Sequence, residues 1–457
     1  MPPQRRIDLV LDSVKRLLRV GATANLFNLL QKQHPADLAQ IFGDLAERDR
    51  TAAFSVLVER NSRLAMETLS ELGPEGGAAL MSGRSAEEIA KLVQEMPPDD
   101  AAALMDHLPD ELSAAVLDLM GRKESGEVEN LLEYPEQTAG RIMNPNVFAL
   151  SEDMTVGEAI TAMQTSRDVE MVFYLYIVDS RRHLVGVTSL RRLLLVSPET
   201  PLKRIMTPEP ISARVDMDQE EVARLVASYN LLAIPVVDES NKLVGVITVD
   251  DVIDVIKDEA TEDLYRLAGV SSDERVFTPA TESLRKRMPW LIVNLATAFL
   301  AAAVVGLFQN TISGWVALAV FMPIVAGMGG NAATQTLTVI VRGIALGELT
   351  WSNSRKALAK ETLVGIGNGL ATGVMAALVA WAMNGDPRLG IILGLALVVN
   401  LFVAGLSGTL IPLGLKALKI DPALASAVFI TTFTDVCGFA SFLGLATLFT
   451  RYFHRAG

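Results

Sequence analysis

The fold class that this sequence predicts is a multi-domain, mainly α-helical membrane protein, and three observations predict it. Charge is divided unequally, because 31 basic and 48 acidic residues precede Pro289, whereas nine basic and five acidic residues follow from there to the C-terminus. Five apolar stretches of membrane-spanning length lie in this second part. An internal repeat organises residues 140–257. We therefore expect an acidic, water-soluble half followed by a membrane domain.

The composition of the acidic half limits its function and its location. Its 17 excess negative charges oppose nucleic-acid binding, which needs a basic surface. Cys437 is the single cysteine, so an intrachain disulfide is excluded and a reducing compartment fits. Charged residues interrupt any early apolar run, so we expect no secretory signal and a cytoplasmic location for this half.

Residues 1–135 are assigned to a cytoplasmic acidic helical domain. Between Leu26 and Leu132, prolines divide a run of short helical patterns, and similar phrases begin at Pro35 and Pro98. This similarity favours a small helical superhelix. Acids lie near the expected helix starts, and they are either solvated N-terminal residues or cation ligands; they are Asp37, Asp99, Asp100 and Asp106.

The repeat covers residues 136–257, with copies at 136–199 and 200–257. Arg141–Pro145 recurs as Arg204–Pro208, and Leu184–Val187 recurs as Leu243–Val246. Each copy predicts a Met-Pro turn, an amphipathic helix, a short strand, a polar turn, a second strand with glycine and a closing helix. This order resembles a tandem pair of CBS domains, which have an α/β fold.

The CBS resemblance implies a cofactor. Such pairs often bind adenosine nucleotides between the copies, through a Thr or Ser and an Asp that follow the glycine-containing strand. Thr248 and Asp251 match this pattern in the second copy, whereas the first copy has Ser189 and carries Arg192 in place of the Asp. ATP or another adenosine nucleotide is therefore expected at Thr248 and Asp251.

Residues 258–284 are assigned to a linker that leads into the membrane domain. Val249–Leu267 predicts a helix on which four acids follow one another at i,i+4 spacing, from Asp250 to Glu262. Stacked like charges destabilise a helix by a few tenths of a kcal/mol per pair, roughly, unless cations neutralise them. The acids form either a solvated face or a site for divalent cations shared between domains, since no Asp-x-Asp-x-Asp-Gly loop is present.

Residues 285–457 are assigned to a membrane domain with five spans. Basic residues gather before the first span, between the second and third, and between the fourth and fifth. By the positive-inside rule these segments are cytoplasmic, which leaves the C-terminus outside. The expected spans are Trp290–Phe308, Trp315–Val341, Leu363–Met383, Gly390–Leu415 and Leu424–Phe449.

Two polar features interrupt the spans. Asp435 lies near the middle of the fifth, where a charge costs at least about 2.5 kcal/mol, so it faces either a water-filled path or a polar partner on a neighbouring helix. In the second span, Gly327–Asn331 is followed by Thr334. Its glycines indicate tight helix packing, irregular pore-lining backbone, or both. Asn400 and the hydroxyls before Asp435 are expected to add polar lining.

The domain order and two membrane motifs, Pro323–Asn331 and Thr432–Gly438, resemble the MgtE family of magnesium channels and transporters. The resemblance covers essentially the whole chain. It implies a homodimer in the plasma (inner) membrane that admits Mg²⁺ through a pore on the twofold axis, with Asp435 as the pore carboxylate and Asn331 and Thr334 beside it. At the position of Thr334 some members have a second Asn.

The resemblance further implies that the linker helix acts as a plug and that cytoplasmic Mg²⁺ favours closure. The regulatory ligands expected on this basis are Asp100, Asp251, Asp254, Glu259, Glu262 and Asp263. Carboxylates with amide and hydroxyl groups suit Mg²⁺, which keeps several of its waters, whereas softer metals prefer Cys and His.

The sequence lacks the motifs of other functional classes. An intramembrane metalloprotease needs a His-Glu-x-x-His helix, and an ATP-driven pump needs a phosphate loop; the sequence has neither, so no enzyme is expected. Two alternatives remain open. One is the same architecture permeating Mn²⁺, Co²⁺ or Ca²⁺, and the other is a membrane-anchored sensor of Mg²⁺ or nucleotide.

Overall fold

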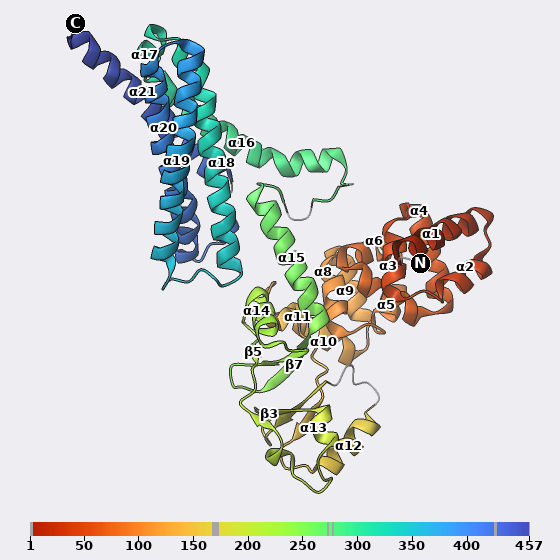
Figure 1. The fold of residues 1–457 in the computed structure, drawn as a ribbon. Helices are drawn as coiled ribbons and strands as arrows, with labels where there is room; N and C mark the ends of the chain where they lie inside the picture. Colours follow the sequence, from red (N-terminus) through yellow and green to blue (C-terminus); the bar gives the residue numbers. More distant parts are fainter. Residues whose placement is uncertain (1–2, 167–172, 272–273, 277, 425–426, 457) are drawn as a thin grey trace. The chain divides into compact units, whose positions relative to one another are not determined.

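A computed structural model describes residues 3–166, 173–271, 274–276, 278–424 and 427–456. The chain divides into two units, Met1–Ile256 and Lys257–Gly457, which are described separately (Figure 1).

The first unit begins with ten short helices, as the sequence predicts. Prolines open four of them, where a missing N–H costs nothing. Side chains of His34, Asn61 and Ser85 accept hydrogen bonds from the first turns of α3, α5 and α7. The helices are α1 Pro3–Val20, α2 Thr23–Leu30, α3 Pro35–Gly43, α4 Glu47–Arg60, α5 Ser62–Leu72, α6 Pro74–Met81, α7 Ala86–Val93, α8 Pro98–Asp106, α9 Asp110–Leu119 and α10 Arg122–Leu132.

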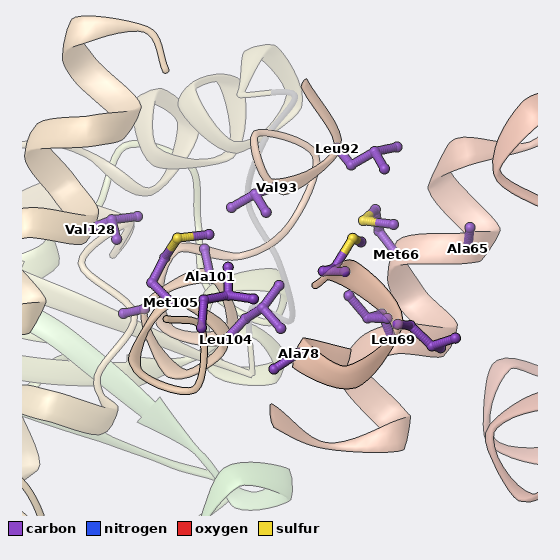
Figure 2. Packing of buried hydrophobic residues seen from close by; sticks show 14 of the residues in the cluster. Ala65, Met66, Leu69, Ala78, Leu92, Val93, Ala101, Leu104, Met105 and Val128 are labelled. Atoms are coloured by element: carbon purple, nitrogen blue, oxygen red, sulfur yellow. The ribbon is translucent and has the colours of Figure 1, made fainter. Parts of the chain in front are cut away.

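One face of α8 fixes the position of the acids at its start. Ala101, Leu104 and Met105 are buried and point into the core between the helices (Figure 2). Each buried large apolar side chain contributes about 1.5–3 kcal/mol, so the rotation of α8 about its axis is set by this face. Asp99 and Asp100 lie in its first turn, after the N-cap residue Pro97.

The repeat forms two small sheets, as expected for a CBS pair. The first has strand order β1-β2-β3-β4 and the second β5-β6-β7, and in each the first pair is parallel and the next antiparallel. The first-copy elements are α11 Ala139–Ile142, β1 Ala149–Ser151, α12 Val156–Thr165, β2 Tyr174–Val178, β3 Leu184–Ser189 and α13 Leu190–Leu194. Those of the second are β4 Thr207–Pro208, β5 Ala213–Arg214, α14 Gln219–Tyr229, β6 Ala233–Val237 and β7 Leu243–Thr248.

The repeated motifs hold the two copies together. Strand β4, from the second Met-Pro motif, pairs with β3 of the first copy, and Asn144 of the first motif pairs with Val246 of the second. A methyl group at Gly186 would lie 2.5 Å from the sulfur of Met206, and one at Gly245 would lie 2.7 Å from that of Met143. Each methionine therefore covers the other copy's glycine, which explains why both motifs recur.

The predicted linker helix is α15, Val249–Leu267, with the bounds expected from the sequence. Its first half packs Val252 and Val255 into the core of the first unit. It ends before Gly269, which has φ +68°, and α16 begins only at Ala280. The assigned linker 258–284 is thus the second half of α15, a connecting segment and the first turn of α16.

The second unit contains the five expected spans: α16 Ala280–Gly306, α18 Ala317–Ala345, α19 Ser354–Asn384, α20 Pro387–Ala417 and α21 Ala427–Ala456. A short helix, α17 Gln309–Gly314, joins the first two. Helices α19 and α20 pack backbone to backbone, because a methyl group at Gly369 would lie 2.8 Å from the Cα of Val398.

The glycine-rich segment of α18 differs from one sequence expectation. The helix is unbroken from Ala317 to Ala345, through both Pro323 and Gly327–Asn331, so irregular backbone is absent from this segment. Its glycines serve close packing instead. Gly329 lies against Asn400 of α20, and Gly330 lies against Thr431 of α21.

Candidate pore and acidic sites

Four polar residues of α18 form an exposed polar stripe, consisting of Asn331, Thr334, Gln335 and Thr338. Their spacing of i, i+3, i+4 and i+7 places them on one helix face, and all four are exposed. Thr334 and Thr338 donate to carbonyls one turn earlier, at 2.9 Å. Asn331 and Gln335 make no side-chain hydrogen bond within the described residues. Within the described part of the chain, the amides of Asn331 and Gln335 are therefore unpartnered on the surface of a membrane-spanning helix.

Asp435 lies in the first third of α21, nearer to the start of this helix than the sequence analysis expects, and it is half-buried. Its carboxylate makes no hydrogen bond or ion pair within the described part of the chain. The polar partner on a neighbouring helix, which the sequence left open, is not found among these residues. Helices α18 and α21 approach closely one turn before Asp435, where a methyl group at Gly330 would lie 3.4 Å from Cγ2 of Thr431.

The other polar residues of the spans lie elsewhere. The structure places Asn400 inside a helix interface, where it is fully buried, and not on an open face. Thr434 is also fully buried, and Thr431 and Thr432 donate to Val428 of their own helix. Buried Glu361 of α19 accepts from Thr336 at 3.2 Å and pairs with Lys360 at 2.5 Å.

An acidic pair lies in the first unit, between α8 and the start of α15. Burial raises the pKa of Asp99 well above its usual range, and the charge of Asp251 raises it further. Burial also raises the pKa of Asp251 to about 6, against the hydrogen bond at 2.7 Å from the Thr248 hydroxyl. Asp99 Oδ1 is buried and has no hydrogen-bond partner among the residues that the structure describes. The two desolvated carboxylates repel each other, and one of their oxygens is unsatisfied. A cation bound between them would offset the repulsion and supply a partner for that oxygen.

Further acids surround this pair. Burial raises the pKa of Asp100, the side chain of Ser70 opposes that shift, and the charges of Asp250 and Asp254 add to it. Asp254 itself is exposed. Five carboxylates of α8 and α15 thus share one region of electrostatic repulsion, although no group of three or more Asp, Glu, His or Cys among the described residues is close enough to hold a metal ion directly.

A second acidic cluster lies in the second unit, at the end of α15. Burial and the charge of Asp421 raise the pKa of Asp263 to about 6, and the guanidinium of Arg266 opposes the shift. Arg266 pairs with both Glu262 and Asp421. The cluster therefore already contains one internal cation, and Glu259 of the same helix is half-buried.

The structure thus sorts the predicted regulatory residues into two groups. Asp100, Asp251 and Asp254 belong to the first unit, whereas Glu259, Glu262 and Asp263 belong to the second. Sequence reasoning missed Asp421, and it named Asp99 only among the acids at helix starts and not among the expected regulatory ligands. Asp421 lies in the loop between α20 and α21, which the positive-inside rule predicts to be cytoplasmic, and this position is the signal that could have indicated it.

The predicted nucleotide residues are adjacent. Thr248 ends β7 and donates to Asp251 through its hydroxyl, and its backbone N–H donates to the same oxygen at 3.3 Å. Ser189, the equivalent residue of the first copy, accepts instead from the backbone N–H of Arg192 at 3.2 Å. The two copies therefore differ in charge at corresponding positions.

Known protein families match most of the chain. The family model described as a divalent cation transporter, MgtE, matches residues 322–445. The MgtE intracellular N domain matches residues 33–137, and the CBS domain matches 139–199 and 202–258.

Individual relatives agree with these matches. The magnesium transporters MgtE of Enterococcus faecalis and Bacillus subtilis are each 38% identical, over 72% of this chain and 73% of their own. A crystal structure of the cytosolic domain of the Mg²⁺ channel MgtE in complex with ATP is 36% identical, with a TM-score of 0.51, and covers 54% of this chain and 99% of its own. Identity at this level over most of both chains shows that the protein belongs to the MgtE family of magnesium transporters.

Proposed function

We propose that the protein is a homodimeric, magnesium-selective channel that admits Mg²⁺ across the plasma (inner) membrane and is closed by cytoplasmic Mg²⁺. The observation that carries this proposal is the polar stripe of α18, exposed on a single chain and close to the helix that bears Asp435. Lipid cannot satisfy unpartnered amides and a carboxylate at this depth. A second copy that encloses a water-filled path would satisfy them.

The chemistry of these groups favours a hydrated divalent cation. Mg²⁺ is commonly bound through one or two carboxylates while it keeps several waters. One Asp435 from each subunit supplies two carboxylates, and Asn331 and Thr334 supply neutral oxygens for the bound waters. Soft metals are disfavoured, because the spans contain a single thiol, Cys437, and no histidine within residues 285–451.

Orientation follows from the basic loops. The first turn of α19 carries Arg355 and Lys356, and the segment between α20 and α21 contains Lys419. With these loops on the cytoplasmic side, the first unit is cytoplasmic and the C-terminus lies outside. Mg²⁺ then moves inward, down the gradient set by the membrane potential.

Closure is proposed to depend on the two acidic groups. Without cations, Asp99, Asp100 and Asp251 repel one another in a desolvated region, and so do Asp263 and Asp421. Bound Mg²⁺ offsets that repulsion and favours the conformation in which α15 acts as a plug. A ligand shifts such an equilibrium only by its differential affinity for the two states, so several sites together give a steep response.

An adenosine nucleotide is proposed as a ligand of the CBS pair. The supporting observations are the ATP complex of the related cytosolic domain and the adjacent Thr248 and Asp251. Because Asp251 also belongs to the acidic group next to Asp99, nucleotide and Mg²⁺ would influence each other at this residue.

The proposal is tested by ion flux into liposomes that contain the purified full-length protein. Asp435→Asn keeps the size of the side chain and removes the charge, and we expect Mg²⁺ flux to be lost. Asp386→Asn is the matched control, because Asp386 caps α20 through the N–H of Arg388 and Asn caps equally well. Undiminished flux in a folded Asp435→Asn dimer would refute the pore assignment.

The same liposomes separate the alternatives. Preference for Mn²⁺, Co²⁺ or Ca²⁺ over Mg²⁺ in the wild type would identify another divalent-cation channel. Absence of any flux from a folded wild-type dimer, combined with Mg²⁺-dependent protection of its linkers from protease, would identify a membrane-anchored sensor.

A further inference from the structure

The side-chain amide of Asn400 joins three membrane-spanning helices. It is fully buried in the middle of α20, and its Nδ2 donates to the backbone carbonyl of Val325 in α18 at 2.8 Å. A carbonyl oxygen accepts only from a donor, so this contact fixes which end of the amide faces α18. The hydrogen bond therefore sets both the position and the orientation of the side chain.

Two glycines make room for this amide. The side chain lies directly against Gly329 of α18, where any Cβ would overlap its nitrogen and carbon atoms. On α21, a methyl group at Gly438 would lie 2.6 Å from Asn400 Nδ2 and 3.1 Å from Cγ1 of Val325. A slot between α18 and α21, closed on one side by Val325, thus holds the amide.

The slot lies next to the groups proposed to form the pore. Gly329 precedes Asn331 by two residues, and Gly438 follows Asp435 by three, which is about 4.5 Å along a helix. A shift of the slot would change the spacing of these two groups, since both lie within one turn of it. Asn400 itself is fully buried within the described unit, so its side chain is not exposed to a passing ion.

Energetics argue against a packing role alone. Asn400 Oδ1 is buried and has no hydrogen-bond partner among the described residues. An unsatisfied buried acceptor is unfavourable, and a leucine of similar size at position 400 would avoid it. The amide is thus less favourable for packing at this position than an apolar side chain of similar size. Its single hydrogen bond goes to α18, the helix that carries the polar stripe.

We infer that Asn400 is a positioning residue for permeation, which holds α18 and α21 at the spacing that lets Asn331 and Asp435 act on the same hydrated cation. This inference rests on the proposed pore. It assigns Asn400 no direct contact with the ion, so its effect is expected on selectivity among divalent cations as well as on rate.

The test compares Asn400→Leu with wild type in liposomes, by the ratio of Mg²⁺ to Ca²⁺ flux per folded dimer. We expect the ratio to fall by about fivefold, the factor that corresponds to one ordinary hydrogen bond. Asn368→Leu is the matched control, because it makes the same change at an exposed position of α19 and should leave the ratio unchanged. An unchanged ratio in folded Asn400→Leu would overturn the inference.

A second route covers the case in which Asn400→Leu does not fold. Gly438→Ala pushes a methyl group against the amide and should also lower the ratio. In the double variant Asn400→Ala/Gly438→Ala the overlap with the amide is removed and only the contact with Cγ1 of Val325 at 3.1 Å remains, so the ratio should lie close to that of Asn400→Ala alone. Additive effects would overturn the inference. Loss of Mg²⁺ flux in the wild type itself would instead contradict the proposed function.

Discussion

Asp251→Asn should stabilise the acidic half of the protein when Mg²⁺ is absent and remove much of the stabilisation that Mg²⁺ provides. Asp251 is half-buried beside Thr248, the charge of Asp250 raises its pKa, and its own charge raises the pKa of Asp99. Asparagine keeps the acceptor oxygen for Thr248 and removes the charge. The substitution therefore isolates the electrostatic cost of a carboxylate at this position.

The size of the effect follows from the pKa of Asp251, which is raised from 3.8 to about 6. A shift of roughly two units corresponds to about 3 kcal/mol at pH 7.5, an upper limit because the neutral amide is also desolvated. In a unit of this size each kcal/mol moves the melting temperature by about 2–4 °C. An increase of several degrees is therefore expected for the variant in EDTA.

The assay is thermal unfolding of the purified full-length protein, in EDTA and in excess Mg²⁺. Wild type should gain from Mg²⁺ by mass action, about 1.4 kcal/mol at ten times the dissociation constant, and the variant should gain much less. Asp118→Asn, on the exposed surface of α9, is the control and should behave as wild type. A variant that melts below wild type in EDTA, or that gains as much from Mg²⁺, would refute the reasoning.

Two further predictions test the pH dependence and the membrane packing. Because the raised pKa of Asp251 favours the protonated form in the folded state, its contribution to stability is greatest below about pH 4 and is lost as the pH rises through 6. Protons therefore compete with Mg²⁺ for Asp251 at low pH. The Mg²⁺ concentration that gives half of the maximal increase in melting temperature should be about tenfold higher at pH 5 than at pH 7.5. If this concentration does not change with pH, Asp251 does not bind the ion. Gly369→Ala should lower the melting temperature in detergent, since its methyl would lie 2.8 Å from the backbone of Val398 and overpacking costs about 1–3 kcal/mol. An added methyl group at Gly367 of the same helix would meet no atom within 4 Å, so Gly367→Ala should not lower the melting temperature. If the two substitutions lower the melting temperature equally, the packing described here is contradicted.

Local patterns in the sequence were sufficient for much of the fold. The linker helix was predicted with both of its bounds, and the five spans follow from apolar length alone. The CBS repeat was visible because each Met-Pro motif packs on the other copy's glycine, so the same contact is encoded twice. Each of these features depends on residues that are close in sequence or repeated within it.

The acidic sites were predicted less completely, because tertiary packing decides them. The Asp99–Asp100 pair reads as an ordinary helix start, and only the burial of Ala101, Leu104 and Met105 turns Asp99 toward Asp251. The linker acids were expected to act together. The structure divides them between two units, and Arg266 supplies an internal cation to the second group.

Asn331 and Asn400 show why the environment of one amide in the membrane domain can be predicted from the sequence and that of the other cannot. Asn331 belongs to the polar stripe, whose period of three and four residues continues through Thr334, Gln335 and Thr338, while off-period Thr336 is buried against Glu361. A repeated period identifies a helix face without knowledge of the neighbouring helices. Asn400 is the single amide of an otherwise apolar helix, so the sequence does not distinguish a pore-lining position from a buried one. Its role is decided by Val325, Gly329 and Gly438, which come from two other helices and are brought together only by the fold.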